Sequence, residues 1–292
     1  MSVLSFLLSS MFRRMDEKRD SGLGTPENVV RYCDIRYGDD PEHNVLDVYR
    51  PKEPDRRLPV IVNVHGGGWV YGDKERYSHY CMHLCGYGFA VVNFTYRLAP
   101  RSKHPAQIED TDRVFAWVDE NADLYGFDRK NVFGIGDSAG AHLLSLYSCL
   151  MSDPGFREKS GIELVSGSAP KALVLNCGIY EIKKTRRKDV VQRLMKVLLP
   201  GKGAEEELHA VSPIEHLTCG FPPCLIMTSE GDFMKEQAAP MADRLGELGV
   251  PAELVCWNDP GHRLDHVFHL DLRSEYALKC AEQECGYLKD FL

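Results

Sequence analysis

Short runs rich in valine and isoleucine alternate with longer segments of helical periodicity along most of the chain. The runs are apolar over most of their length, as in "LPVIVNVHG" (58–66) and "FAVVNFTY" (89–96). A strand that is apolar on both faces must be covered on both sides, and the connecting helices of a parallel sheet supply that cover. The alternation predicts an α/β fold, with a mostly parallel sheet flanked by helices in one domain spanning residues 1–292.

The other expected elements continue this alternation. Further strands are expected at 44–51, 131–140, 171–180, 222–232 and 252–259. Helices are expected at 77–88, 105–126, 141–151, 235–249 and 273–292. Because parallel strands end at one edge of the sheet, ligands are expected at that edge.

Two segments stand outside the alternation. The N-terminus places apolar residues at helical spacing, which predicts an amphipathic helix through Leu4, Leu7, Leu8, Met11 and Met15. Residues 181–210 are helical in pattern and fall between two expected strands, and their basic run 183–188 is expected to be a solvated helix face. Together with residues 1–40, this insertion is predicted to form a cap over the strand ends.

Charge and cysteine usage narrow the class of protein. The 292 residues carry a net charge of −8 with both signs interspersed, so no nucleic-acid partner is expected. No stretch reaches transmembrane length, so no membrane partner is expected. Ten scattered cysteines suit reduced thiols in the cytoplasm. The cluster "HYCMHLC" (79–85) is explained by a helix that buries Cys81, Leu84 and Cys85, so no metal or cofactor is predicted.

The stretch "GIGDSAG" contains Gly-x-Ser-x-Gly centred on Ser138, between an expected strand and an expected helix. This context is the one in which the motif holds a nucleophilic serine on a sharp turn. A serine hydroxyl needs a general base and a carboxylate that orients the base. Asp232 follows a late strand and is favoured over Glu230 as that carboxylate. Spacing alone leaves the base open among three histidines of "PGHRLDHVFHL": His262, His266 and His269.

Three consecutive glycines follow the strand at 58–64, in "HGGGW" (65–69). Attack by Ser138 on a carbonyl would create an oxyanion, which requires preorganised N–H donors. The amide of Ala139, next after the serine, is one expected donor, and the glycine loop is expected to supply the other. No Gly-Lys-Ser/Thr follows the loop, which argues against a phosphate-binding role.

Four stretches occur in a fixed order: "HGGGW" (65–69), "YRLAP" (96–100), "HPAQIED" (104–110) and "GDSAG" (136–140). In sequence and separation they resemble the successive signatures of the hormone-sensitive-lipase-like esterases, a branch of the α/β-hydrolase superfamily. The resemblance runs from about residue 40 to the C-terminus. It implies an eight-stranded sheet with a helical cap, and hydrolysis of carboxylic esters with short acyl chains.

Carried onto this sequence, the resemblance implies Ser138 as nucleophile and Asp232 as acid, with Gly67, Gly68 and Ala139 as the oxyanion donors. It implies a structural role for His65 in the glycine loop. His266 fits the family's His-x-Phe pattern near the C-terminus, although His262 lies closer to the usual distance from the acid. The sequence departs from the family at Ala141, where a second glycine is usual.

The expected function is that of a serine carboxylesterase with a small-molecule ester substrate, working through an acyl-enzyme. The C-terminal tail also resembles esterases that deacetylate plant polysaccharide fragments, so an acetyl esterase acting on acetylated saccharides is one alternative. A ligand-binding homologue without catalysis is a second, and cleavage of an amide bond is a third. A homodimer is left open.

Overall fold

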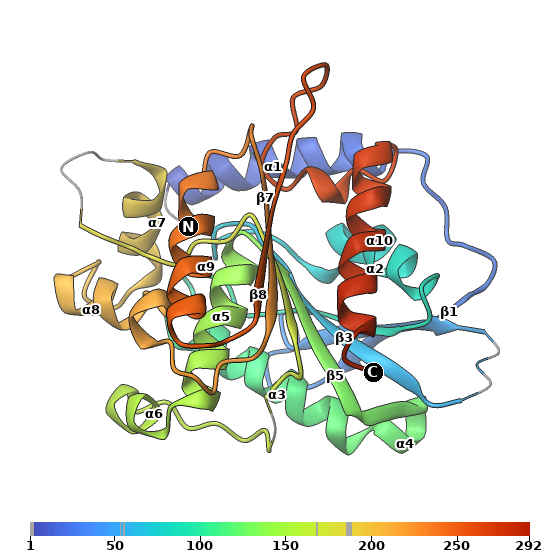
Figure 1. Cartoon of the computed structure of the whole chain (residues 1–292), viewed down its shortest axis with the longest axis horizontal. Helices are drawn as coiled ribbons and strands as arrows, with labels where there is room; N and C mark the ends of the chain where they lie inside the picture. The colour runs from blue at the N-terminus through green and yellow to red at the C-terminus, as the bar shows by residue number, and fades with distance from the viewer. Residues whose placement is uncertain (1–2, 53, 55, 168, 185–188) are drawn as a thin grey trace.

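The computed structural model describes residues 3–52, 54, 56–167, 169–184 and 189–292, with side chains from residue 10 onward. At its centre lies an eight-stranded sheet in the order β1-β2-β4-β3-β5-β6-β7-β8 (Figure 1). Strand β2 is antiparallel to β1 and β4, and the other neighbours pair in parallel. The predicted mostly parallel sheet is confirmed. The strands are β1 (Val29–Arg36), β2 (Val45–Pro51), β3 (Leu58–Val64), β4 (Ala90–Thr95), β5 (Phe127–Asp137), β6 (Leu173–Asn176), β7 (Cys224–Ser229) and β8 (Ala252–Trp257).

Helices cover both faces of the sheet and bury two separate apolar cores. Strand side chains alternate between the cores: Val60 and Val62 of β3 point into one, and Ile61 points into the other. The first core is closed by α3 (Ala106–Glu120), α5 (Ala139–Ser152) and α9 (Ala238–Glu247). The second is closed by α2 (Ser78–Cys85) and α10 (Glu275–Lys289), which lie side by side in Figure 1.

Several shorter helical elements lie between the strands and the main helices. They are α4 (Ala122–Tyr125), α6 (Pro154–Ser160) and the 3-10 turns η1 (Lys74–Tyr77), η2 (Pro213–His216), η3 (Lys235–Gln237) and η4 (Phe268–Leu270). Helix α6 begins after Asp153, whose side chain accepts hydrogen bonds from the first-turn amides, and it ends at a left-handed glycine. The sequence analysis did not predict α6.

The N-terminal segment differs in part from the expectation for residues 1–40. Helix α1 (Val3–Asp20) forms as predicted, but Met11 and Met15 are exposed, and the side chains of Leu4, Leu7 and Leu8 lie outside the described residues. The side that contacts the rest of the molecule carries Phe12, Asp16 and Arg19, which are spaced by four and three residues. Residues 29–36, predicted as part of a cap, instead form the edge strand β1.

The segment 181–210 contains two helices, α7 (Val190–Leu198) and α8 (Glu205–Ala210). Of the basic run 183–188, Lys183 and Lys184 are exposed but lie in an irregular segment, so these two residues do not form the expected helix face. Residues 185–188 lie outside the described residues. Helix α7 begins after Asp189, whose side chain caps it.

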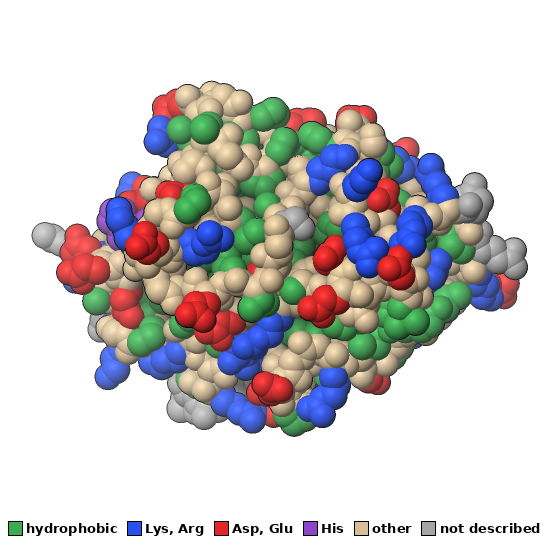
Figure 2. All heavy atoms as spheres, turned by 90° about the horizontal axis from the view of Figure 1, so that it is seen from below, with side chains coloured by type: hydrophobic (Ala, Val, Ile, Leu, Met, Phe, Trp, Pro, Cys, Tyr) green, Lys and Arg blue, Asp and Glu red, His purple; other side chains and the backbone are tan. Residues whose placement is uncertain are grey.

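Helix α2 buries Cys81, Leu84 and Cys85 as expected. All ten cysteines lie in the described part of the chain and are free thiols. Among the described helices, none combines the length and apolar character needed to cross a bilayer. On the face shown in Figure 2, acidic and basic side chains are interspersed.

Candidate active site

Ser138 occupies the sharp turn between β5 and α5, with a backbone φ of 49° and ψ of −116°. This positive φ is rare for a residue other than glycine and marks local strain. Helix α5 can pass this close to β3 because residue 140 is glycine: a β-carbon there would overlap the carbonyl oxygen of Val64. The amide of Ser138 donates to the carbonyl of Asn176 at the end of β6 (2.9 Å), which fixes the turn against the neighbouring strand.

Three side chains predicted from the sequence meet at the carboxyl edge of the sheet. His266 Nε2 lies 2.9 Å from Ser138 Oγ, and His266 Nδ1 lies 2.6 Å from Asp232 Oδ1. Since an ionised carboxylate can only accept a hydrogen bond, Nδ1 carries the ring hydrogen and Nε2 is left to accept from the serine. The arrangement has the connectivity of a Ser-His-Asp relay.

Asp232 is held by more than the histidine. Its carboxylate also accepts from the Thr228 hydroxyl and from the Met234 amide, each at 2.8 Å. Burial raises the pKa of this carboxyl group, but the hydrogen bond and charge of His266, with the other two donors, outweigh burial and hold the pKa below its ordinary value. Asp232 is therefore ionised at neutral pH.

The structure distinguishes the predicted acid and base from the other candidates in the sequence. Glu230 is exposed and pairs with Lys235 at 3.0 Å. His262 is 77% exposed and contacts Asp259 at 2.7 Å, on the loop after β8 that projects from the top of Figure 1. His269 is buried against Tyr80, and burial lowers its pKa to about 3. None of these three residues contacts Ser138.

The loop that carries His266 is tied to the strand ends. Gly231 forms a parallel bridge with Asp265, and the Ser229 hydroxyl donates to the Leu264 carbonyl at 2.8 Å. Beyond the histidine, the Val267 amide donates to Cys177 Sγ at 3.4 Å. These contacts fix the backbone on both sides of the imidazole, and none was predicted from the sequence.

The glycine loop turns its backbone back on itself. Gly67 has φ of 108°, and a β-carbon there would overlap the carbonyl of Tyr71. Its carbonyl accepts the Tyr71 amide at 3.1 Å. The amide of Gly66 is already engaged, by the Tyr77 hydroxyl at 2.8 Å and by Asp137 at 3.1 Å. This leaves the amides of Gly67 and Gly68 as the loop's expected oxyanion donors.

Ala139 is the first residue of α5, so its amide has no helical acceptor behind it. Such an amide also lies at the positive end of the helix dipole. It remains the expected third donor, next to Ser138 and across from the glycine loop.

His65 packs inside the loop, away from the relay. Its ring stacks on Tyr96 with centroids 4.0 Å apart, and Nδ1 donates to the Gly66 carbonyl at 2.7 Å. Burial lowers the pKa of His65 to about 4, so the ring is neutral. The Tyr96 hydroxyl in turn donates to the His65 carbonyl at 2.9 Å, which joins the first two sequence signatures.

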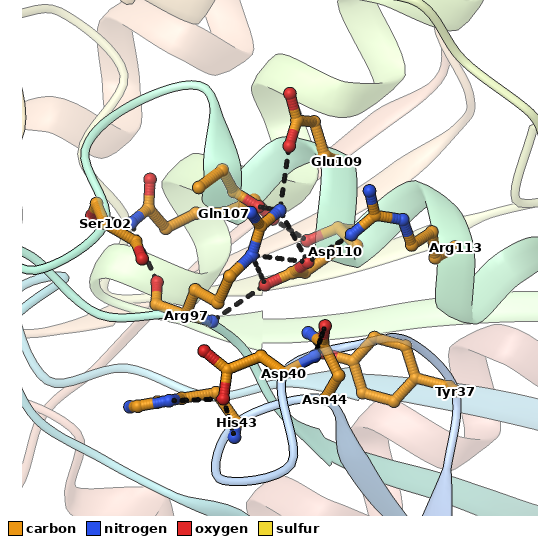
Figure 3. Close-up of polar contacts among 12 residues, drawn as sticks. Tyr37, Asp40, His43, Asn44, Arg97, Ser102, Gln107, Glu109, Asp110 and Arg113 are labelled. Carbon is orange, nitrogen blue, oxygen red and sulfur yellow. Dashed lines mark hydrogen bonds and ion pairs between the residues drawn. The ribbon is translucent and has the colours of Figure 1, made fainter.

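The second and third signatures are joined by an arginine cluster (Figure 3). The Arg97 guanidinium and amide both donate to the buried carboxylate of Asp110, at 2.8–3.0 Å. The same guanidinium reaches Glu109 at 2.8 Å, and Arg113 reaches Asp110 at 3.0 Å. The cluster fixes the loop after β4 to the first turn of α3, and none of these contacts involves Ser138, Asp232 or His266.

Two buried carboxyl groups near the nucleophile were not predicted. Asp137 accepts from Tyr77 at 2.9 Å, and burial raises its pKa to about 6. Glu284 of α10 accepts from Tyr80 (2.7 Å) and Asn176 (2.6 Å), and burial raises its pKa to about 7. The available signal for Glu284 was its position in the apolar stripe of α10, among Ala277, Cys280, Ala281, Cys285 and Leu288.

One group of possible metal ligands occurs among the described residues: Cys177, Asp232 and His266, with ligand atoms within 4.8 Å of one another. Two of its three members already hydrogen-bond to each other in the relay. Burial also raises the Cys177 pKa well above its ordinary value, which disfavours the thiolate that a metal would require. We therefore assign no metal or cofactor to these residues.

The parallel sheet, the serine turn and the relay at its edge define an α/β hydrolase. A family model described as BD-FAE matches residues 46–242. Two proteins of Mycobacterium tuberculosis are similar in sequence. "Probable carboxylic ester hydrolase LipM" is 31% identical over 74% of this chain and 52% of its own length, and "Carboxylesterase NlhH" is 29% identical over 73% and 68%. The chain spans about half the length of the first of these relatives.

Solved structures share the fold. Esterase B from Lactobacillus rhamnosis (HN001) superposes with a TM-score of 0.87 at 23% identity, over 98% of this chain and 93% of that one. The thermophilic carboxylesterase EstE1, cloned from a metagenomic library, gives a TM-score of 0.79 at 22% identity over 100% and 99%. The chain belongs to the BD-FAE family. Together with the relatives, this match identifies it as a hormone-sensitive-lipase-like esterase of the α/β-hydrolase superfamily, as its signatures predicted.

Proposed function

We propose that this protein is a serine carboxylesterase that hydrolyses short-chain acyl esters through an acyl-enzyme. The observation that carries the proposal is the hydrogen-bonded series from Ser138 through His266 to Asp232, at 2.9 and 2.6 Å. Membership in a family of carboxylic-ester hydrolases supports the same reaction.

In the proposed reaction, Ser138 Oγ attacks the ester carbonyl while His266 Nε2 takes its proton. Asp232 stabilises the resulting imidazolium. The oxyanion receives hydrogen bonds from the amides of Gly67, Gly68 and Ala139, each worth about 3–4 kcal/mol of barrier. His266 then protonates the leaving alcohol, and the same base activates the water that releases the acid.

Two comparisons support a short acyl group. One relative, 29% identical over 70% of the chain, is named "Versiconal hemiacetal acetate esterase" (Dothistroma septosporum). Esterase B was solved with a C4-C4 tributyrin phosphonate inhibitor. Acetyl esters, including acetylated saccharides, are therefore among the substrates to be tested.

We also propose that α1 and the α7–α8 segment form a cap over the glycine loop. The Tyr71 hydroxyl donates to Asp16 of α1 at 2.7 Å, and the ring of Phe12 lies 5.7 Å from that of Tyr71. From α7, Leu194 packs directly over Gly68. For location we propose the cytoplasm, which the ten free thiols support.

The deciding experiment is Ser138→Ala, assayed with p-nitrophenyl acetate and with a fluorophosphonate probe. We expect hydrolysis and labelling to be lost while the circular dichroism spectrum and melting temperature are kept. Ser148→Ala is the matched control, because Ser148 lies on the same helix but bonds only to the Leu144 carbonyl (2.8 Å) among the described residues. Wild-type protein that neither reacts with the probe nor hydrolyses any ester would instead indicate a ligand-binding homologue.

A panel of acetyl esters, acetylated sugars and a matched anilide then defines the bond and the alcohol. Faster turnover of the anilide than of the ester would contradict the proposed preference.

A further inference from the structure

Trp69, His142 and Val211 form a closed wall beside the nucleophile. The edge-to-face contact between the Trp69 and His142 rings has a centroid distance of 5.0 Å, and His142 Nε2 donates to the Val211 carbonyl at 2.7 Å. All three residues are buried, with exposed fractions of 0%, 1% and 1%. Trp69 directly follows the glycine loop, and the His142 amide donates to the Ser138 carbonyl at 3.1 Å, so the wall lies next to both the nucleophile and the expected oxyanion donors.

A row of side chains on α5 leads from the nucleophile past this wall. Residues four apart on a helix lie on the same side, and this row is Ser138, His142, Leu146 and Leu150. The last two line a cavity of about 250 Å³, together with Val211. The axial rise places Leu146 about 12 Å from Ser138, with His142 between them.

The cavity is chemically suited to an alkyl chain. Its apolar lining includes Leu146, Leu150, Phe156, Ile162, Leu199 and Val211. Glu207 also lines it, but its carboxylate is occupied by the amides of Gly201, Gly203 and Ala204 at 2.6–3.1 Å. Two other polar residues line the cavity, His104 and Ser160. Burial lowers the pKa of His104 to about 4, so its ring is neutral, and the Ser160 hydroxyl donates to the Arg157 carbonyl at 2.7 Å. With its acidic member occupied and no charged histidine, the cavity favours hydrocarbon over a charged ligand.

We propose that His142 is the gate that limits acyl-chain length, and that the cavity behind it accepts the distal part of a medium-chain fatty acyl group once this side chain is shortened. The inference rests on the proposed esterase function and names the determinant of its short-chain preference. The limit is set by one histidine held between Trp69 and the Val211 carbonyl, and not by a lack of apolar space in the fold.

The test compares kcat/KM for p-nitrophenyl decanoate and p-nitrophenyl acetate in wild type and His142→Ala. We expect the decanoate-to-acetate ratio to rise about tenfold or more in the variant, because several methylenes gain an apolar site. Adding Leu146→Phe to His142→Ala should return the ratio toward wild type, since the larger ring fills the cavity entrance. Ser148→Ala, on the same helix, should leave the ratio unchanged.

His142→Asn provides a second variant if the alanine protein does not fold, because its amide retains a hydrogen-bond donor for Val211 in a smaller side chain. It should raise the ratio by a smaller factor. A ratio that stays constant in a folded His142 variant would overturn the inference, as would a wild-type enzyme that already prefers decanoate. Either result leaves the esterase function standing, provided that wild type hydrolyses acetate and Ser138→Ala does not.

Discussion

Replacing Glu284 with glutamine should make the protein progressively more stable than wild type as the pH rises. Glu284 is fully buried in α10, and burial raises the pKa of its carboxyl group from 4.5 to about 7, although hydrogen bonds from Tyr80 and Asn176 oppose the shift. A raised pKa means that the folded state retains a proton that the unfolded chain releases. The stability that this proton contributes is complete below pH 4.5 and is lost as the pH rises through about 7.

The size of the effect follows from the two pKa values. Each unit of difference corresponds to about 1.4 kcal/mol, and integration between pH 5 and pH 8 gives a loss of about 2.5 kcal/mol in wild type. Glutamine does not titrate, so the variant lacks this loss. Its amide can be accommodated, because Asn176 Oδ1 is buried without a hydrogen-bond partner and can accept from it after an amide flip.

The assay is urea unfolding followed by circular dichroism, for both proteins, at pH 5, 6, 7 and 8. The quantity of interest is the difference in unfolding free energy between variant and wild type at each pH. Groups that do not interact with Glu284 contribute equally to both proteins and cancel. Asp137 does not cancel completely, because its charge is one cause of the raised Glu284 pKa. Glu282→Gln, an exposed neighbour on the same helix, should show a constant difference. A difference for Glu284→Gln that also stays constant, or that falls with pH, would refute the assignment of a buried, protonated carboxyl.

Two further substitutions test the backbone around the nucleophile. Gly140→Ala should abolish soluble, active protein, because its β-carbon would overlap the Val64 carbonyl; recovery of wild-type yield and activity would show that α5 can move away from β3. Tyr77→Phe removes a hydroxyl that bridges Asp137 and Gly66, and should lower the unfolding free energy by about 1–3 kcal/mol while reducing kcat more than it raises KM. Urea unfolding measures the stability of this variant, and steady-state kinetics with the acetate ester measure its kcat and KM. A variant in which only KM changed would contradict the expected loss of kcat.

The sequence predicted those parts of the fold that depend on local pattern. Strands buried on both faces, such as β3 and β4, are apolar at nearly every position and are easily recognised. Strand β1 was missed because it pairs only with β2 at the sheet edge, and most of its side chains are exposed. Residues with one weakly buried face carry too little periodic signal to be distinguished from a loop.

The candidate site was likewise predictable from local sequence only in part. Ser138 and Asp232 were predictable because each follows a strand of a parallel sheet, and the topology brings such positions to one edge. The choice among three histidines depends on the path of the loop after β8, which leaves His262 in solvent and buries His269. Spacing carries no information about that path, and only the resemblance to a family pattern favoured His266.

The contacts beneath the serine were hidden for a different reason, since they link residues far apart in sequence. Ser138 is held through its amide by Asn176, and the Asn176 side chain is held by Glu284, which is 108 residues further along the chain. On the other side, Asp137 holds the Gly66 amide across 71 residues. Burial raises the pKa of both acids, and the groups that they hold oppose this rise: the Asn176 side chain for Glu284 and the Gly66 amide for Asp137. The serine turn and the glycine loop are thus fixed by two carboxyl groups outside the relay, so the geometry for attack is established before any substrate binds.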